Sequence, residues 1–333
     1  MSATMDPRAI EREIGRIRER ESNPYSSGVK TNLFNLVIFA GQGEAGAQAA
    51  APALQHLLGK RAARVITIDG EGAGQSTGAV VSGRCFPDAR SRGVCFEEIR
   101  IFAEAPGMDI GAWAPLLIRD IPVYAWRLGR PTRESLAPVL EAAEFIDKLI
   151  VDSSAGLSRA SAREAIHALG AFRSAVRRSV VVSDFAWRRT HALRVQAARA
   201  FDPPETRARL GEIREVSVVD LPPAEGALFF LWLASRLGWA PGQGPTLRGP
   251  ATEAKGAAGN APALRVAAEL HFSNGEPLVL GAKPVSDGEI LLAEVDSLYQ
   301  DALLEDALAQ ADALALADAL SPADAPAPAE GAT

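Results

Sequence analysis

The sequence predicts an α/β protein, with a mixed sheet and flanking helices in an amino-terminal domain and a second α/β or α+β domain. The apolar segments 33–40 (LFNLVIFA) and 64–69 (RVITID) have the pattern of buried strands, and a helix expected between them at 48–59 starts a βαβ unit. The segments 79–86 (AVVSGRCF) and 94–103 (VCFEEIRIFA) are rich in β-branched and aromatic residues and flank a turn-rich stretch, which predicts an antiparallel pair. At 333 residues, the chain is long enough for two domains of ordinary size.

The remaining elements of the first domain are predicted from the spacing of its apolar residues and the position of a proline. Ile10, Ile14 and Ile17 recur at helical spacing between charged residues, which predicts an amphipathic helix over residues 7–21 that docks on this domain. The next helix is expected to be interrupted or kinked near Pro52. Beyond the antiparallel pair we expect a helix near 109–119, a strand at 122–128, a helix at 132–143 and a strand at 145–153.

The second domain is expected to contain both helices and strands. Residues 240–262 are rich in glycine and proline and predict a flexible loop, and the end of the chain is of low complexity and is predicted to be disordered. The expected elements are helices at 159–177, 185–200 and 223–237, a strand at 213–219, a hairpin of 264–272 and 276–283, and a helix from about 287. The expected divisions are an amino-terminal helix and linker (1–30), the first domain (31–155), the second domain (156–305) and a tail (306–333).

Composition narrows the classes of function. The formal net charge of -6 and the pI near 5.4 give no attraction to nucleic acid, and no apolar run approaches the ~20 residues of a membrane span. Because the first residues also lack the apolar region of a signal peptide, we expect a cytoplasmic protein with neither nucleic-acid nor membrane partners. The four histidines share no motif, and we expect no metal and no cofactor.

The segment from 183 to 239 is dense in tryptophan and arginine, the residue types that dominate protein–protein hot spots. It makes Trp187, Arg188, Arg189 and Arg194 candidates for partner binding, with the arginines directed at an acidic patch or a phosphate. The alternative is structural: Asp184 caps a helix, Trp187 lies in the core and the arginines form internal ion pairs.

A glycine-rich loop follows the first strand. Gly41, Gly43 and Gly46 match the G-x-G-x-x-G pattern of dinucleotide-binding proteins, and Asp69 ends the next strand at a plausible distance for a ribose hydroxyl. A negative charge at Glu44 and a proline inside the following helix argue against a phosphate site. The alternatives are a nucleotide loop, serving an NAD(P)-dependent oxidoreductase or sensor, and an ordinary strand-to-helix connection.

Two cysteines lie on the predicted antiparallel pair. Cys85 and Cys95 flank one turn, so a disulfide between them is possible if the register places them opposite each other on one face. Free thiols are the default in a reducing cytoplasm. The pair is therefore a candidate redox switch with free thiols as the alternative.

Charged residues inside apolar segments are expected to have structural roles and not catalytic ones. Arg236 interrupts an apolar helix and is expected to pair with a carboxylate such as Asp220 or Asp202. Glu97 and Glu98 are neighbours on a strand, so their side chains point to opposite faces and cannot act together in acid–base catalysis.

Several separated segments, in one order along the chain, resemble the OpcA family, the glucose-6-phosphate dehydrogenase assembly proteins. The resemblance runs from the amino-terminal helix to about residue 305. It is carried by NLFNLVIFA (32–40), ARVITID (63–69), DIPVYAWR (120–127), KLIVDSS (148–154), SDFAWRR (183–189), AFDPPETRARL (200–210), ALFFLWLASRLGW (227–239) and SLYQDAL (297–303).

The resemblance implies a non-catalytic assembly factor or allosteric activator of glucose-6-phosphate dehydrogenase, which supports NADPH production in the oxidative pentose phosphate pathway of carbohydrate metabolism. It gives no catalytic residues. OpcA-like proteins of photosynthetic bacteria are associated with thioredoxin-dependent control, so the resemblance adds thioredoxin as a second possible partner. The chain departs from the family at Gly41–Gly46, because such a glycine pattern is not characteristic of OpcA-like chains.

Overall fold

The computed structural model describes most of the chain as two compact units. The described residues are 2–3, 6–22, 32–42, 44–57, 60–70, 78–87, 93–103, 110–155, 158–176, 180–240, 244–249 and 265–313. The first unit comprises Met1–Ala155, Ala168–Arg188 and Val285–Asp301, and the second comprises Gly156–His167, Arg189–Pro284 and Ala302–Thr333. Segments 168–188 and 285–301, expected in the second domain, therefore belong to the first unit.

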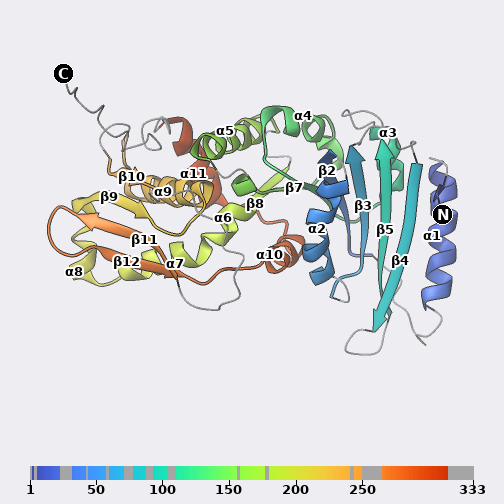
Figure 1. Cartoon of the computed structure of the whole chain (residues 1–333), viewed down its shortest axis with the longest axis horizontal. Coiled ribbons are helices and arrows are strands. Elements are labelled where there is room, and N and C mark those ends of the chain that lie inside the picture. The colour runs from blue at the N-terminus through green and yellow to red at the C-terminus, as the bar shows by residue number, and fades with distance from the viewer. Residues whose placement is uncertain are drawn as a thin grey trace, which may run out of the picture. The chain divides into compact units, whose positions relative to one another are not determined.

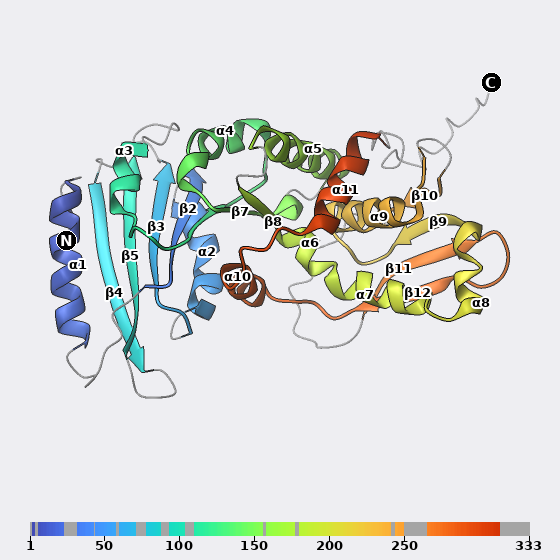
Figure 2. The same ribbon diagram turned by 180° about the vertical axis from the view of Figure 1, so that it is seen from behind.

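The first unit is built on an eight-stranded mixed sheet with the strand order β1-β4-β5-β3-β2-β6-β7-β8. Figures 1 and 2 show β4, β5, β3 and β2 side by side in this order. From β5 to β8 neighbouring strands are parallel, whereas β4 is antiparallel to β5 and β1 is antiparallel to β4. The predicted mixed sheet is confirmed. The bounds are β1 Ser2–Ala3, β2 Phe34–Gln42, β3 Ala63–Gly70, β4 Gly78–Pro87, β5 Gly93–Ala103, β6 Val123–Arg127, β7 Lys148–Val151 and β8 Val181–Asp184.

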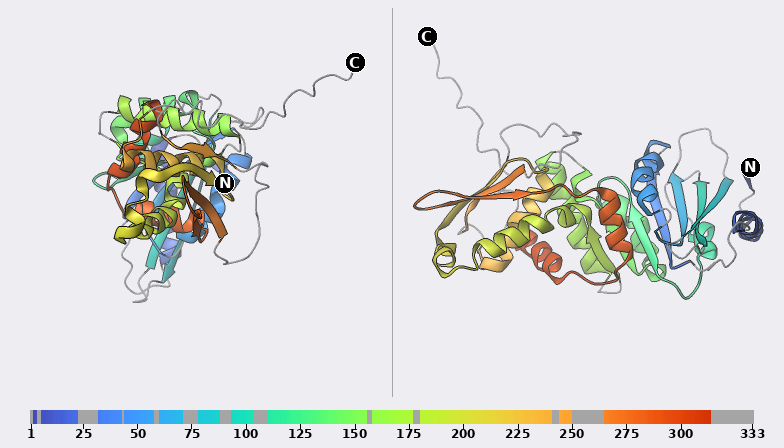
Figure 3. Two further views of the ribbon diagram at one scale, coloured as in Figure 1. Left: turned by 90° about the vertical axis from the view of Figure 1, so that its left-hand side faces the viewer. Right: turned by 90° about the horizontal axis from the view of Figure 1, so that it is seen from below.

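Helices cover this sheet because each presents an apolar stripe to it. The helix α1 (Pro7–Ser22) buries Ile10, Ile14 and Ile17 and packs along β4, as Figure 1 and the right-hand view of Figure 3 show. The helices α2 (Glu44–Leu57) and α10 (Asp287–Val295) pack against each other. The other helical segments here are α3 Ile110–Trp113, η1 Ala114–Leu116, α4 Arg133–Glu141, η2 Ala143–Phe145, η3 Ser153–Ala155 and α6 Phe185–Arg189.

The core of the first unit lies between the parallel strands and helices α2 and α10. Its strands contribute Leu36, Ile38, Val65 and Ile150, each with 0% exposure, and α10 contributes Leu291. Burying an aliphatic side chain of this size stabilises a fold by about 1.5–3 kcal/mol. Through Ile290, Leu291 and Val295, helix α10 is therefore part of the core of the first unit.

The second unit contains a four-stranded sheet in the order β10-β9-β11-β12, with α7 packed on β12 and α11 packed on α9 (Figure 2). The predicted hairpin is confirmed as β11 and β12, which are antiparallel, and Gly275 in its turn has a φ of 87°. The bounds are α7 His191–Ala200, α8 Pro204–Arg207, η4 Leu210–Glu212, β9 Ile213–Val218, α9 Pro223–Leu237, β10 Thr246–Arg248, β11 Arg265–Phe272, β12 Leu278–Ala282 and α11 Ala302–Ala313.

Several predicted elements differ from those observed. Pro52 lies inside α2, which continues past it to Leu57. The helix predicted over 185–200 divides at Thr190 into α6 and α7. The helix α5 (Arg159–Ala175) contributes residues to both units, and the strand β8, which precedes α6, was not predicted.

Two further corrections concern segments that were expected to lack structure. Part of the 240–262 segment forms the parallel edge strand β10, and the first residues of the 306–333 segment belong to α11. The other residues of these two segments lie mostly outside the described ranges. Arg236 forms an ion pair with Asp306 of α11, not with Asp220 or Asp202.

Candidate functional site

A buried ion cluster in the first unit joins two of the resemblance segments, 148–154 and 183–189, to helix α10. Lys148 starts β7, Arg188 lies in α6 and Glu294 lies in α10. The side chains of Lys148 and Glu294 are 1% and 0% exposed, and their charged atoms are 2.5 Å apart. Arg188 pairs with the other carboxylate oxygen of Glu294 and keeps 31% of its side chain exposed.

The surroundings of this cluster set its charge state. Burial lowers the pKa of the Lys148 amine, although the Glu294 carboxylate opposes that effect. Burial alone would raise the pKa of Glu294, but the positive charges of Lys148 and Arg188 outweigh it, so the pKa is lowered. Lys148 Nζ also donates to the backbone carbonyls of Glu294 (2.9 Å) and Ser297 (2.8 Å), which satisfy two of its three N–H donors.

A second buried carboxylate joins the ends of two parallel strands. Asp184 ends β8 and is 0% exposed, and its Oδ1 accepts hydrogen bonds from the backbone N–H groups of Ser153 (2.9 Å) and Ala186 (3.1 Å). Its Oδ2 lies 2.6 Å from the hydroxyl of Ser153. Burial, assisted by the negative charge of Asp152, raises the pKa of Asp184 to about 7.

Side-chain contacts also anchor the segment that follows α10. The indole nitrogen of Trp187 donates to Asp301 at 2.8 Å, and the backbone N–H of Val182 donates to the side chain of Gln300 at 3.3 Å. Since β8 is the last strand of the sheet, the second contact satisfies a backbone donor at its outer edge.

The structure assigns the four partner-binding candidates mainly structural positions. Trp187 is 1% exposed and Arg194 is 5% exposed, so neither is available as a surface anchor. Arg188 pairs with Glu294, and Arg189 Nη1 lies 3.5 Å from Glu225 Oε1. Trp187 thus lies in the core, and Arg188 and Arg189 form ion pairs within the chain, as the structural alternative expects. A role of these four residues in partner binding stays a prediction.

Lys148 and Glu294, the two central residues of the cluster, were not among the residues predicted from the sequence to form a site. Lys148 is the one basic residue in the segment 145–153 that was predicted to be a strand, and Glu294 lies among apolar residues of α10. A charged residue inside an apolar element is the signal that could have identified both, because such residues are buried only when paired.

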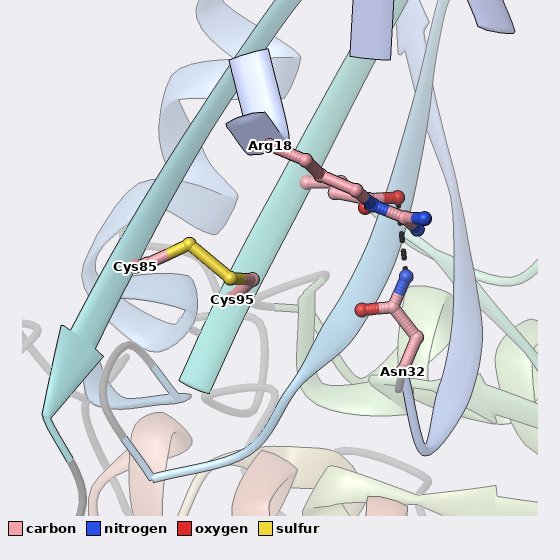
Figure 4. Close-up of a disulfide and its surroundings, with 5 residues drawn as sticks. Arg18, Asn32, Cys85 and Cys95 are labelled. Carbon is pink, nitrogen blue, oxygen red and sulfur yellow. Dashed lines mark hydrogen bonds and ion pairs between the residues drawn. A yellow bond between two sulfur atoms is a disulfide. The ribbon is translucent and has the colours of Figure 1, made fainter. Parts of the chain in front are cut away.

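A disulfide joins Cys85 and Cys95 in the first unit (Figure 4). The two residues are direct partners in the β4–β5 register, which is the condition that the sequence analysis set for a disulfide. On the same face, α1 approaches closely enough that a Cβ at Gly83 would lie 2.8 Å from Ile17. Arg18 of α1 pairs with Glu97 of β5, which also accepts from Asn32 at 3.1 Å.

The glycine-rich loop is only partly described. Gly41 lies in β2 and Gly46 in α2, while Gly43 lies outside the described residues. Asp69 is the register partner of Gly41, is 4% exposed and binds Arg100 through one carboxylate oxygen. The ion pair with Arg100 engages the oxygen Oδ2, so Asp69 already has a partner for its charge.

A small cavity lies beside α2, on the opposite face of the β4–β5 pair from the disulfide. Its volume is about 210 Å³, and it is lined by residues that include Leu54, Arg84, Phe96 and Glu98. Ligand pockets span about 300–1,000 Å³, so this cavity is small for a cofactor. Within the described ranges, no group of three or more His, Cys, Asp or Glu is placed to hold a metal ion. No helix in those ranges has the length and hydrophobicity that crossing a bilayer requires.

Two family models match consecutive parts of the chain. Residues 55–173 match the glucose-6-phosphate dehydrogenase subunit N-terminal domain, and residues 180–308 match the C-terminal domain of the same subunit. Together they include the buried ion cluster, the Asp184 site and the disulfide.

Curated relatives carry the name "Putative OxPP cycle protein OpcA". The protein of Synechococcus elongatus is 31% identical over 153 residues, which cover 44% of this chain and 33% of the relative. That of Nostoc punctiforme is 32% identical over 153 residues, covering 44% and 31%. The matches thus span about a third of the relatives' own length.

Solved structures give only distant likenesses. Biliverdin reductase from Synechocystis aligns over 85% of this chain and 97% of its own, with 11% identity and a TM-score of 0.42. The oxidoreductase yvaA from Bacillus subtilis aligns over 86% and 96%, with 9% identity and the same TM-score. Likenesses at this level say nothing of what this chain does.

Proposed function

Since this chain belongs to the OpcA family of glucose-6-phosphate dehydrogenase subunits, we propose that it is a non-catalytic partner that promotes assembly or activation of that dehydrogenase. The observation that carries the proposal is the match of both family domains, in order, over residues 55–173 and 180–308. In this role the protein supports NADPH production in the cytoplasm.

The buried charges support a non-catalytic role. Strongly perturbed titratable groups often mark active sites, but Lys148 and Glu294 are buried and bound to each other. The carboxyl group of Asp184 is likewise buried, and its Oδ1 accepts hydrogen bonds from the backbone N–H groups of Ser153 and Ala186. These groups stabilise the fold and are not open to a substrate.

A partner of this kind acts by differential affinity. If it binds the active form of the dehydrogenase more tightly than the inactive form, it shifts the populations of the two forms toward the active one. No chemical step on this chain is needed.

We expect the purified chain to form a complex with glucose-6-phosphate dehydrogenase from the same organism and to raise its activity. Light scattering of the mixture measures the complex, and NADPH formation followed by absorbance measures the rate. The dehydrogenase alone and a mixture with an unrelated acidic protein are the controls, because they separate specific binding from crowding or charge effects.

Absence of both complex and rate change would contradict the proposal. A higher melting temperature with NADP or NAD would then favour the alternative, an oxidoreductase or sensor that binds a nucleotide at Gly41–Gly46, because a ligand specific for the folded state stabilises it. One observation keeps this alternative open: Asp69 Oδ1 is buried and has no hydrogen-bond partner among the described residues.

We further propose that the protein is regulated by reduction and oxidation of the disulfide between Cys85 and Cys95. Cys85 is partly exposed while Cys95 is buried, and α1 packs over the same face of the strand pair. A thioredoxin-type dithiol would deliver two electrons and two protons to the disulfide, becoming oxidised as the two thiols form.

We expect reduction to lower the free energy of unfolding by about 3 kcal/mol, because the disulfide closes a short loop in the unfolded chain. Urea unfolding of the oxidised and reduced protein measures the difference. The Cys85→Ser, Cys95→Ser double variant is the control, since it should match the reduced protein and be insensitive to reductant. If the oxidised and reduced wild-type proteins are equally stable, the proposed regulation through this disulfide is contradicted.

A further inference from the structure

The segment between α10 and α11 exposes two large apolar side chains. Tyr299 is 75% exposed, the highest value for any large hydrophobic residue within the described ranges, and its neighbour Leu298 is 42% exposed. Surface hydrophobic residues that stand singly need no explanation. Leu298 and Tyr299 are instead consecutive residues of one segment.

Buried polar contacts hold the backbone on both sides of this pair. Before it, Lys148 Nζ donates to the Ser297 carbonyl at 2.8 Å. After it, Gln300 accepts from β8 and Asp301 accepts from the indole of Trp187. The N–H of Tyr299 itself donates to Ser297 Oγ at 3.1 Å. The segment is thus tied at Ser297, Gln300 and Asp301, and the two side chains between these ties project outward.

A tyrosine on a fixed backbone is suited to recognition. Its side chain has two rotatable angles and offers a large rigid surface, so little conformational entropy is lost when it is covered. Tyrosine is also among the residue types that are enriched at interface hot spots. Lys148 and Trp187 therefore position a contact residue besides stabilising the core.

The charges next to the pair are already matched. Glu294 faces Lys148 and Arg188, and Asp296 holds Arg61 through two contacts of 2.6 and 2.7 Å. These five residues carry three positive and two negative formal charges, and each charge has a partner of opposite sign. The net charge of these five residues is only +1, and each charge is engaged in an ion pair within the chain, so they offer little attraction to a polyanion or an acidic lipid surface.

We propose that Leu298 and Tyr299 form a docking point for a partner protein whose surface offers an uncharged apolar pocket with a hydrogen-bond partner for the tyrosine hydroxyl. The inference rests on the proposed function, so the occupant is glucose-6-phosphate dehydrogenase. Contact through apolar area fits neighbouring charges that are already engaged in ion pairs within the chain, and it makes the docking only weakly dependent on salt.

Titration of the dehydrogenase with the full chain tests the proposal. We expect Tyr299→Ala to weaken the complex about 30-fold, the scale of a hot-spot residue, and Tyr299→Phe to retain most of the affinity. Leu298→Ala should weaken it less than Tyr299→Ala does. Raising the salt concentration should leave most of the wild-type affinity in place.

Leu33→Ala is the matched control, because Leu33 is also a large apolar residue of the first unit and is 55% exposed. It should bind as the wild type does. The melting temperature of Tyr299→Ala should match that of the wild type, because the side chain is 75% exposed and the bond to Ser297 is made by the backbone N–H.

The outcomes separate this inference from the function on which it rests. If Tyr299→Ala binds the dehydrogenase as tightly as the wild type does, Leu298 and Tyr299 are not the docking point, although the dehydrogenase remains the partner. A wild-type chain that does not bind the dehydrogenase would overturn both. If Tyr299→Ala instead disrupts a dimer of this chain and leaves dehydrogenase binding intact, the occupant is a second copy and the proposal is wrong.

Discussion

Glu294→Ala should lower the free energy of unfolding by about 3–5 kcal/mol, the effect expected when one partner of a buried ion pair is removed. The substitution leaves the ammonium group of Lys148 in an environment that is 1% exposed, without the carboxylate that compensates its desolvation. Urea unfolding followed by tryptophan fluorescence measures the loss. Because folded proteins are stable by only about 5–15 kcal/mol, this is a large share of the total.

Two control variants make the Glu294 result specific. Glu294→Gln keeps the shape of the side chain and a carbonyl oxygen for Lys148, so it should lose less stability than the alanine variant. Asp296→Ala removes a carboxylate that also binds an arginine but is 39% exposed, and surface pairs contribute about 0–1 kcal/mol. Equal losses in Glu294→Ala and Asp296→Ala would show that the buried cluster has no special energetic role.

Asp184→Asn should change the dependence of stability on pH. The folded protein keeps a proton on Asp184 up to a pKa of about 7, whereas the unfolded chain releases it near the ordinary value of 3.8. The folded state therefore binds more protons between these values, and the stability from this group is full below about pH 4 and is lost as pH rises toward 7. From pH 5 to pH 8 the wild type should lose on the order of 2–3 kcal/mol through this group.

The asparagine variant should not show this loss. Its carbonyl oxygen can accept from the N–H groups of Ser153 and Ala186, as Asp184 Oδ1 does. Its amide can donate to the oxygen of the Ser153 hydroxyl, which in the structure donates to Asp184 Oδ2. Its stability should match the wild type near pH 5 and exceed it near pH 8. Asp220→Asn, at an exposed carboxylate, is the control and should follow the wild type. A wild type and an Asp184→Asn variant with parallel pH profiles would contradict a titration at Asp184 in this range.

Much of the first unit could be predicted from local pattern. The strands at 34–42 and 63–70, the amphipathic helix with Ile10, Ile14 and Ile17, and the β4–β5 pair all leave a periodic or continuous apolar signal. The same reasoning missed the four-residue strand β8, because so short an element beside the apolar start of α6 has no distinct period.

Long-range pairing could not be predicted from pattern. Arg236 was expected to bind Asp220 or Asp202 and binds Asp306, because α11 packs on α9 and brings a carboxylate from 70 residues away. Trp187 and Arg188 were candidates for a surface and instead meet Asp301 and Glu294. In each case the partner lies on an element whose position is set by packing between distant segments.

The sequence by itself determined the fold class, the hairpin that carries Cys85 and Cys95, and the resemblance to the OpcA family, because these depend on residue types at fixed spacings along the chain. Only the tertiary structure decided that segment 285–301 completes the first unit, that Lys148 and Glu294 form its buried ion cluster, and that Tyr299 remains exposed. The physical reason is that burial and charge pairing are properties of three-dimensional neighbours, and a residue's spacing in the sequence does not specify which distant segment will cover it.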